Sequence, residues 1–501
     1  MTRPDQSAAV LLLACIGAAP FASALEIRPS VAVGAVYTSN LKLDPANEKD
    51  DVVTRVDPRL DISHTSPRIS LLADYTYSYL KFSKDDKGDA SFGAGSAALD
   101  LALIKGLLVL KTRGDRSQQL IDPEDKHGYT NIPLIEGRIN QTILETGPHL
   151  QTKLGNVGID TRYQLGRINY GKPDSQGVDP DPNDPVPDIQ DVDYQAARTT
   201  IGSEKLSKGL SWDLFHHYDV YKYENGPDTK AQTAYLTLTY GLRQAGDFYV
   251  FGSGGLESDY RDIAAASLTD SRWELGLRRV TARTLVEASF GERSFGSTLN
   301  ATLRRALNKG SIELAYREDP SGQEQILQQR ARPTKPPLER STSAIAPQPP
   351  GVPDNIGRPG LGERFVLRVL SATLLKEIGR NKIEVVAFNE KRDDILSRET
   401  LPLVDPTIAP ESEKQTGIKG KASRQLGPRT TLGLEAEVTN RQFRDGNDDR
   451  LSNGRVVGTY ALGRKLSLEG FLAHYRQQGS NTDSDNYKEF QVGMSANYKF
   501  R

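Results

Sequence analysis

Six aspartates lie within one proline-rich stretch of the chain, residues 171–192. Carboxylate oxygens at this density are the ligands that Ca²⁺ takes, and Asp179, Asp181 and Asp184 are the candidates for such a site. The stretch also carries five prolines and has no regular ligand spacing. A solvated, extended loop explains this composition more simply than a calcium site does.

Histidine, serine and glycine patterns do not form a catalytic, zinc or phosphate site. His216 and His217 are adjacent, and adjacent residues of a strand point to opposite faces, so they cannot both bind one metal ion. The run GSGG at 252–255 lacks the Lys-Ser/Thr pair of a phosphate-binding loop and fits a strand that bulges or kinks. Ser and His form no recognisable nucleophile motif. We therefore expect no enzymatic activity and no cofactor.

A different charge pattern runs along predicted strands. Arg55, Asp57, Arg59 and Asp61 occupy every second position, so their side chains share one face. We expect such faces to line a wet interior, either as an ion network that braces the wall or as a charged surface along which sugars and ions pass. The same inward orientation is predicted for Arg364, Arg368, Glu384, Glu435 and Arg441.

The closing segment, residues 487–501, indicates the kind of sheet to which these charged faces belong. Its apolar side chains fall on every second residue, with aromatic rings at both ends of the stripe and polar residues from Gln491 to Lys499 behind it. A lipid-facing strand of a membrane barrel has this pattern. A terminal aromatic strand is also what the outer-membrane barrel assembly machinery recognises, although Arg501 here follows the usual last Phe. The residues predicted to face lipid in this assembly strand are Phe490, Val492, Met494, Tyr498 and Phe500.

The same alternation recurs along the chain, for example at Phe365, Leu367 and Val369, and no convincing amphipathic helix interrupts it. Short turns alternate with mostly longer polar loops, which gives about 22 strands, with a range of about 18 to 24. We predict an all-β fold, a transmembrane antiparallel β-barrel with short periplasmic turns and long extracellular loops at 171–192 and 319–362. A soluble all-β form is the alternative, but little second-sheet core is visible.

The first 24 residues have the pattern of a signal peptide. Arg3 precedes an apolar run, and Ala22-Ser23-Ala24 is a small-residue cleavage site, so residues 25–501 would form the barrel. Cleavage there removes Cys15, the single cysteine, which excludes disulfides and thiolate metal sites. Lipoprotein processing at Cys15 is the alternative. We expect the protein in the bacterial outer membrane, in contact with lipid and lipopolysaccharide.

The overall charge excludes some classes of partner. The chain has 64 Lys and Arg against 65 Asp and Glu, a net charge of −1, so neither nucleic-acid binding nor general electrostatic adhesion follows. The mean hydropathy of −0.52 is too polar for helical membrane spans. A chain of this polarity can cross a membrane as a closed barrel, because a barrel satisfies every backbone group inside lipid.

Two central segments and the closing strand carry a family resemblance. The stretches FYVFGSGGLESDY at 248–260 and EASFGERSFGSTLNATL at 287–303 resemble the PEP-CTERM system-associated outer-membrane proteins, which are found beside exopolysaccharide loci. In arrangement the chain is also similar to the barrel proteins of exopolysaccharide operons. The resemblance implies an outer-membrane location and a link to polysaccharide or surface-protein export, with exopolysaccharide or its export proteins as partners. Its motifs are structural and transfer no catalytic residue.

The loop at 319–362 contains nine prolines and a basic run, so it should be extended and hard to pack. A barrel of about 22 strands is wide enough to need a plug, and we expect no plug domain before the first strand. We hypothesise that this loop folds back to constrict the pore, its basic groups attracting acidic polymer. A mobile surface loop without a gating role is the alternative. The basic residues are Arg330, Arg332, Lys335 and Arg340.

Together these features predict a passive pore or an export channel in the outer membrane, with exopolysaccharide as a candidate cargo. The alternative is a non-conducting barrel that serves as an assembly or anchoring partner for surface polysaccharide or protein export.

Overall fold

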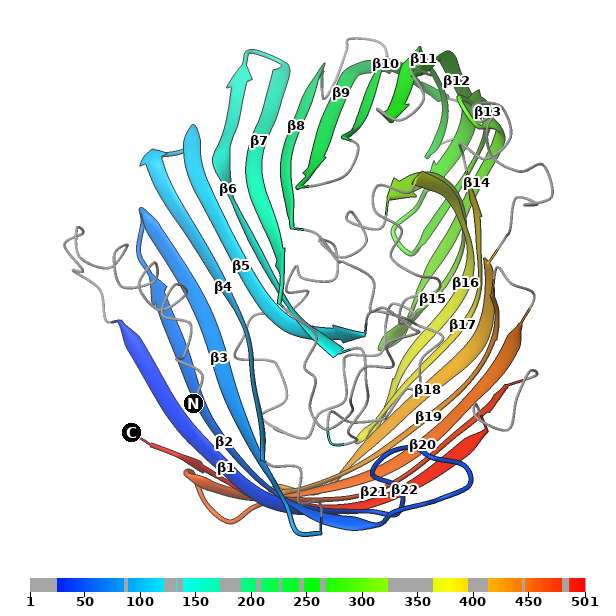
Figure 1. The fold of residues 1–501 in the computed structure, drawn as a ribbon. Helices are drawn as coiled ribbons and strands as arrows, with labels where there is room; N and C mark the ends of the chain where they lie inside the picture. The colour runs from blue at the N-terminus through cyan, green and yellow to red at the C-terminus, as the bar shows by residue number, and fades with distance from the viewer. Residues whose placement is uncertain are drawn as a thin grey trace.

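The computed structural model describes residues 25–84, 89–120, 132, 138–171, 191–203, 209–224, 228–242, 247–261, 267–322, 364–394, 413–443, 447–479 and 486–500. Within these ranges the chain forms one antiparallel sheet of 22 strands. Each strand pairs with the next along the sequence, and β1 also pairs with β22, which closes the sheet into a barrel (Figure 1). The predicted all-β barrel is confirmed. No helix long and apolar enough to cross a membrane occurs in the described part of the chain.

The strands of the first half are β1 (Glu26–Thr38), β2 (Asp51–Thr65), β3 (Ile69–Phe82), β4 (Ala90–Ile104), β5 (Leu108–Leu120), β6 (Arg138–Leu154), β7 (Val157–Tyr170), β8 (Val192–Ser203), β9 (Leu210–Tyr223), β10 (Thr229–Leu242) and β11 (Phe248–Arg261). Those of the second half are β12 (Ser267–Val280), β13 (Thr284–Arg293), β14 (Gly296–Leu307), β15 (Gly310–Gly322), β16 (Arg364–Ile378), β17 (Asn381–Asp394), β18 (Glu413–Gly427), β19 (Thr430–Gln442), β20 (Asp448–Ala461), β21 (Leu466–Gly479) and β22 (Tyr487–Lys499).

Short turns join the strands at one end of the barrel, and mostly longer connections join them at the other. The turns 155–156 and 379–380 have two residues each, and Gly155 and Gly379 adopt a φ of +60° there. Such tight hairpins need a positive φ, which glycine adopts without a steric cost. The predicted start of the loop at 319–362 is wrong: β15 continues to Gly322, because residues 319–322 still pair with β16.

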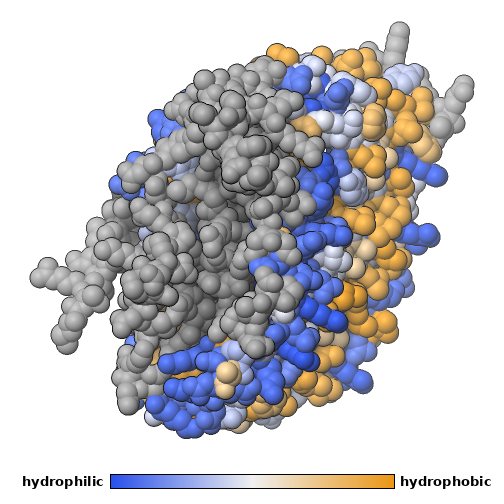
Figure 2. Space-filling model, turned by 45° about the vertical axis from the view of Figure 1, so that its right-hand side comes forward, coloured by the Kyte–Doolittle hydropathy of each residue, from blue (hydrophilic) through white to orange (hydrophobic). Residues whose placement is uncertain are grey.

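The two faces of the sheet differ in chemistry. Large apolar side chains are exposed on the outer face, for example Leu275 at 63% and Met494 at 67%. The inner face holds buried polar groups, and Arg441, Glu489 and Gln491 are each 1% exposed. Figure 2 shows hydrophobic residues covering much of the outer wall beside a hydrophilic zone. This distribution suits a wall with lipid outside and a polar interior.

The first connection, residues 39–50, lies against the inside of the barrel. Leu41 is buried with inward-facing residues of β1 to β4 and β21, and Leu43 is buried against Tyr475 and Tyr487. The amide of Asn40 donates a hydrogen bond of 3.3 Å to the carbonyl oxygen of Lys488, which ties the connection to β22. The described part of this connection therefore covers part of the inner wall on both sides of the β1–β22 seam.

Strand β16 faces the opposite way from the prediction. Leu367 and Val369, which were expected to face lipid with Phe365, line a cavity inside the barrel. Phe365 also points inward, because the Arg392 guanidinium lies over its ring at 5.0 Å. Arg368, which was expected inside, belongs to the outer face. The predicted lipid stripe of this strand is therefore wrong.

Pairing with β15 explains this reversal. Leu370 is paired with Tyr316 and Ala372 with Leu314, and Leu370 and Leu314 are exposed apolar residues of the outer face. In the segment around them, RFVLRVL, one face carries both arginines and the other is wholly apolar, so alternation alone assigns the wrong face to lipid. The neighbouring strand makes that choice.

Candidate functional site

Ion pairs between inward-facing residues hold the inner wall together. Arg55 Nε lies 2.6 Å from Asp57 Oδ1 on β2, and both side chains are buried. Arg441 Nε on β19 donates a hydrogen bond of 2.7 Å to Asp449 Oδ1 on β20. A charge removed from water needs a partner, so these pairs compensate the burial of the guanidinium groups. The predicted ion network is present, and other lumenal pairs are Arg59–Asp61, Arg278–Glu287, Lys419–Glu437 and Lys421–Glu435.

A row of stacked side chains crosses β8 to β12 on the inner wall. The rings of Phe215 and Tyr235 stack with their centroids 4.8 Å apart. The Arg198 guanidinium lies 5.0 Å from the Phe215 centroid, and the Arg272 guanidinium lies 4.0 Å from the Tyr235 centroid. Each cation is attracted by the negative face of its ring. The row thus places two stacked aromatic rings between two positive charges on the lumenal wall.

Gly255 makes this row possible. It stands between Tyr235 and Arg272 in the register of β10, β11 and β12. A Cβ atom at Gly255 would lie 2.6 Å from the Cα and Cβ atoms of Tyr235. With no side chain in this position, Arg272 can reach across β11 to the ring. The run 252–255 is therefore a regular stretch of strand, and its inward glycine makes room for a cross-strand contact.

The same arrangement recurs around the barrel. An inward aromatic ring covers a glycine that is its direct cross-strand partner, and a cation from a neighbouring position lies over the ring. The ring thereby shields the bare glycine backbone, and the cation keeps a polar group on the lumenal side. The sets are Phe251, Gly276 and Arg278; Phe388, Gly417 and Lys419; and Phe471, Gly493 and Arg455.

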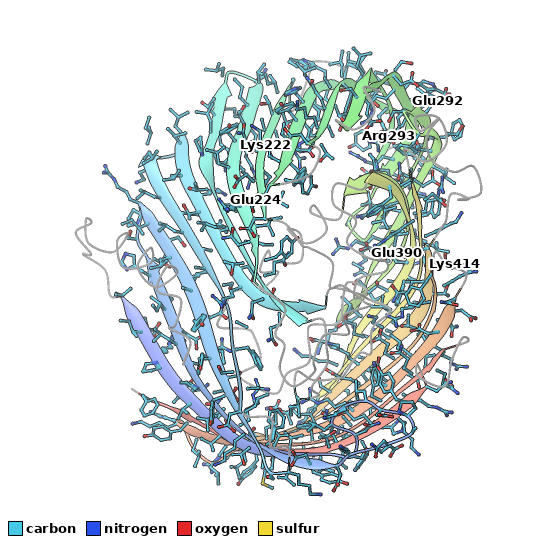
Figure 3. All side chains as sticks on the ribbon, in the orientation of Figure 1. Lys222, Glu224, Glu292, Arg293, Glu390 and Lys414 are labelled. Carbon is cyan, nitrogen blue, oxygen red and sulfur yellow. The ribbon has the colours of Figure 1, made fainter. Side chains whose placement is uncertain are left out.

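A cavity of about 770 Å³ lies on the inner wall formed by β8 to β16 and includes the stacked row. Arg293 of β13 spans it: Arg293 Nη2 lies 2.5 Å from Glu257 Oε1 on β11, and Nη1 lies 3.4 Å from Asp319 Oδ1 on β15. Figure 3 shows Glu292 and Arg293, neighbours on β13, on opposite sides of the wall. The cavity offers hydrogen-bonding groups of both charges beside aromatic faces, a surface suited to a polar ligand.

The wall divides next to this cavity. The β14–β15 ladder ends at Ala301 and Tyr316, although β15 stays paired with β16 as far as its last residue. Above this point Glu318 Oε2 accepts a hydrogen bond of 3.1 Å from the backbone N–H of Leu299, and the Asn300 side chain accepts one of 3.1 Å from the N–H of Glu318. Side chains therefore satisfy backbone groups that the ladder leaves unpaired.

The outer face beside this division is charged. Arg368 Nε lies 3.4 Å from Glu318 Oε1, and Arg368 also contacts Asp393 of β17, whose carboxylate lies 2.9 Å from Lys391 Nζ. Pro320 of β15 follows, and a proline suits a strand position with no partner on one side. This group is close to the end of the barrel where the long connections emerge.

Several predicted site residues lie outside the described residues: the calcium candidates Asp179, Asp181 and Asp184, and the constriction candidates Arg330, Arg332, Lys335 and Arg340. The predicted assembly strand is described. Phe490, Val492, Met494, Tyr498 and Phe500 are all exposed on the outer face.

The two adjacent histidines point to opposite faces. His217 Nε2 lies 3.1 Å from Asp219 Oδ1 on the lumenal side, whereas His216 lies 3.1 Å from the Gln232 side chain on the outer side. Among the described residues, no group of three or more His, Cys, Asp or Glu side chains could hold a metal ion.

Comparison with solved structures shows which known folds this barrel resembles. The ferric enterobactin receptor PfeA from Pseudomonas aeruginosa, in complex with enterobactin, superposes with a TM-score of 0.50 at 12% identity, covering 95% of this chain and 82% of the receptor. This protein is an outer-membrane β-barrel. The siderophore receptor PirA from the same organism has a TM-score of 0.46 at 10% identity, covering 95% of this chain and 80% of that one. No protein family and no curated protein matches the sequence.

Proposed function

We propose that this outer-membrane barrel is a passive pore or export channel for polar solutes, with exopolysaccharide as its cargo. The observation that carries the proposal is the cavity on the inner wall of β8 to β16, where two stacked aromatic rings lie between two guanidinium groups. A pore must bind its solute well enough to admit it and weakly enough to release it, and rows of paired charges provide such shallow binding.

Flat aromatic faces suit the apolar faces of sugar rings, while Arg and carboxylate groups suit their hydroxyls. The inner wall repeats this combination at Phe251, Phe388 and Phe471. A saccharide chain could therefore exchange one contact for the next along the lumen. The resemblance to PEP-CTERM-associated barrels supports the same cargo, with exopolysaccharide export proteins, lipopolysaccharide and the barrel assembly machinery as proposed partners.

Single-channel recording in a planar bilayer tests the proposal. We expect stable ion conductance from the purified barrel, and transient blocks when a neutral oligosaccharide is added. Tyr235→Ala should shorten the blocks, because it removes one of the two rings of the stacked row. Phe290→Ala is the matched control, since Phe290 is an exposed ring on the outer face.

Absence of conductance from a correctly assembled barrel would contradict the pore. It would instead favour the non-conducting assembly or anchoring partner of a surface-export system. Conductance without saccharide blocks would keep a pore but remove the proposed cargo.

A further inference from the structure

The short turns at one end of the barrel share an unusual charge. Eight of them are described completely: 66–68, 105–107, 155–156, 281–283, 308–309, 379–380, 428–429 and 462–465. All except 155–156 contain Lys or Arg, and none contains Asp or Glu. We call these basic residues the turn ring; they are Arg68, Lys105, Arg283, Lys309, Arg380, Arg429, Arg464 and Lys465.

The turn ring carries free positive charge. Seven of its members are exposed and Lys465 is partly exposed. None forms an ion pair with a carboxylate in the described part of the chain, in contrast to the paired cations of the lumen. Because the whole chain has a net charge of only −1, the ring is a local segregation of charge and not a consequence of a basic composition.

The opposite end of the barrel is different. There Lys84 Nζ lies 2.8 Å from Asp50 Oδ1, Arg167 Nη2 lies 3.2 Å from Asp191 Oδ2, and Lys488 is 3.8 Å from a Glu48 oxygen. The hydrogen bond from Lys84 lowers the pKa of Asp50, so this carboxylate stays charged and compensates the amino group. These three cations are thus neutralised by the chain itself, whereas no carboxylate of the described residues neutralises the turn ring.

The position of the ring defines what it meets. In bacterial barrels the short turns face the periplasm. The basic turns are β2–β3, β4–β5 and the five short turns from β12–β13 to β20–β21, so they border the mouth except on the side of β6 to β11. Screening in the periplasm limits each charge to about 8 Å, so the ring acts on molecules at the mouth itself. A ring suits a ligand that passes through its centre, whereas a protein docked beside the barrel would need a patch on one side.

We infer that the turn ring captures an acidic polysaccharide from the periplasm and guides it into the lumen. This inference rests on the proposed export function and adds the substrate class and the entry side. A polymer with a carboxylate on many of its sugars is attracted to the unpaired cations at the mouth. Inside the lumen, the polymer meets aromatic rings and cations that already form ion pairs with carboxylates. The lumen therefore holds the polymer less tightly than the turn ring does, and the polymer can move on.

Equilibrium binding to the full chain in nanodiscs of zwitterionic lipid tests the inference without requiring conductance. The probe is fluorescently labelled polygalacturonate, with dextran of similar length as the neutral comparison and polyglutamate as the acidic polypeptide. We expect polygalacturonate to bind best, and its affinity to fall steeply as salt is added. Changing Arg283, Lys309, Arg380 and Arg429 to Gln should weaken binding at least about tenfold.

The matched control changes four cations at the opposite end, Lys42, Lys49, Lys84 and Lys488, to Gln and should leave binding within about twofold. A gel shift on boiling shows whether each variant is assembled. If the first variant fails to assemble, Arg68→Gln combined with Arg464→Gln and Lys465→Gln tests the same ring on other turns.

Three results would overturn the inference. Equal loss in both sets of variants would mean that the ring is not the binding surface. Polyglutamate binding as tightly as polygalacturonate would point to an acidic protein partner. Binding that appears only when the nanodisc contains anionic lipid would assign the ring to lipid headgroups. Binding as expected from a barrel that fails to conduct would keep the turn ring as a polysaccharide-binding surface, but would remove the pore and with it the guidance into the lumen.

Discussion

At the scale of single residues, the packing of the inner wall depends on glycines, because a position without a side chain leaves room for groups of neighbouring strands. Gly255 and Gly254 are adjacent on β11 and face opposite sides. A Cβ atom at Gly255 would lie 2.0 Å from the carbonyl oxygen of Ala234, whereas one at Gly254 would meet nothing within 4 Å. Two glycines that look alike in the sequence therefore tolerate side chains very differently.

Gly255→Ala should lower the free energy of unfolding by about 1–3 kcal/mol, because the backbone of β10 must shift to admit the methyl group. It should also move Arg272 away from Tyr235. Gly254→Ala should change stability by less than about 0.5 kcal/mol, since its methyl group points to open space on the outer face. Chemical denaturation of both variants in lipid vesicles measures the difference. Equal effects would show that the close approach across β10 and β11 does not limit this position.

The buried pair Arg441 and Asp449 gives a second test at this scale. Asp449→Asn leaves a guanidinium with 0% of its side chain exposed facing a neutral group, which should cost about 3–5 kcal/mol. Lys382→Gln removes an exposed ion pair with Glu377 and should cost less than about 1 kcal/mol. The same denaturation experiment compares them. A small effect of Asp449→Asn would mean that water reaches this part of the wall and solvates Arg441.

At the scale of strands, alternation in the sequence predicts the fold well because lipid and water act on opposite faces of each strand. It fails in the segment RFVLRVL of β16, where alternation assigns the arginine-bearing face to the lumen. Arg368 lies on the outer face instead, where Glu318 and Asp393 pair with its charge. Alternation also cannot reveal that the missing side chain of Gly255 lets Arg272 reach a ring on β10, since this contact depends on the cross-strand register. The inward position of Leu41 and Leu43 had a signal in the sequence: they are two leucines in an otherwise polar connection.

Strand β22 offers a prediction that depends on depth in the membrane. Met494 lies in the middle of the strand and is 67% exposed on the outer face, while Phe500 follows its end. Met494→Arg should destabilise the assembled barrel by about 2–4 kcal/mol, and Phe500→Arg by about 0–1 kcal/mol, because a charge costs most at the bilayer midplane. The fraction of protein that shifts on boiling measures assembly. Equal loss in both variants would indicate that Phe500 acts through the assembly machinery and not through burial in lipid.

At the scale of the whole molecule, the free width of the lumen depends on what lies against the inner wall. The described part of the first connection, residues 39–50, is held there by the burial of Leu41 and Leu43. The constriction by residues 319–362 stays a prediction. The first connection can be tested separately, because its contacts are with strands that keep their own ladders when it is released.

Leu41→Ser combined with Leu43→Ser should release this connection from the wall, because a hydroxyl cannot replace the buried apolar contacts without a partner. The barrel should still assemble, since none of the strand pairs involves these residues. Single-channel conductance should then rise and the current should become noisier, because a segment that narrowed the lumen moves on the timescale of the recording. Lys49→Ser, at an exposed position of the same connection, is the control and should leave the current unchanged. An unchanged current in the double variant would show that the conduction path passes along the opposite wall, beside the stacked row of β8 to β12, and selectivity would then be set there.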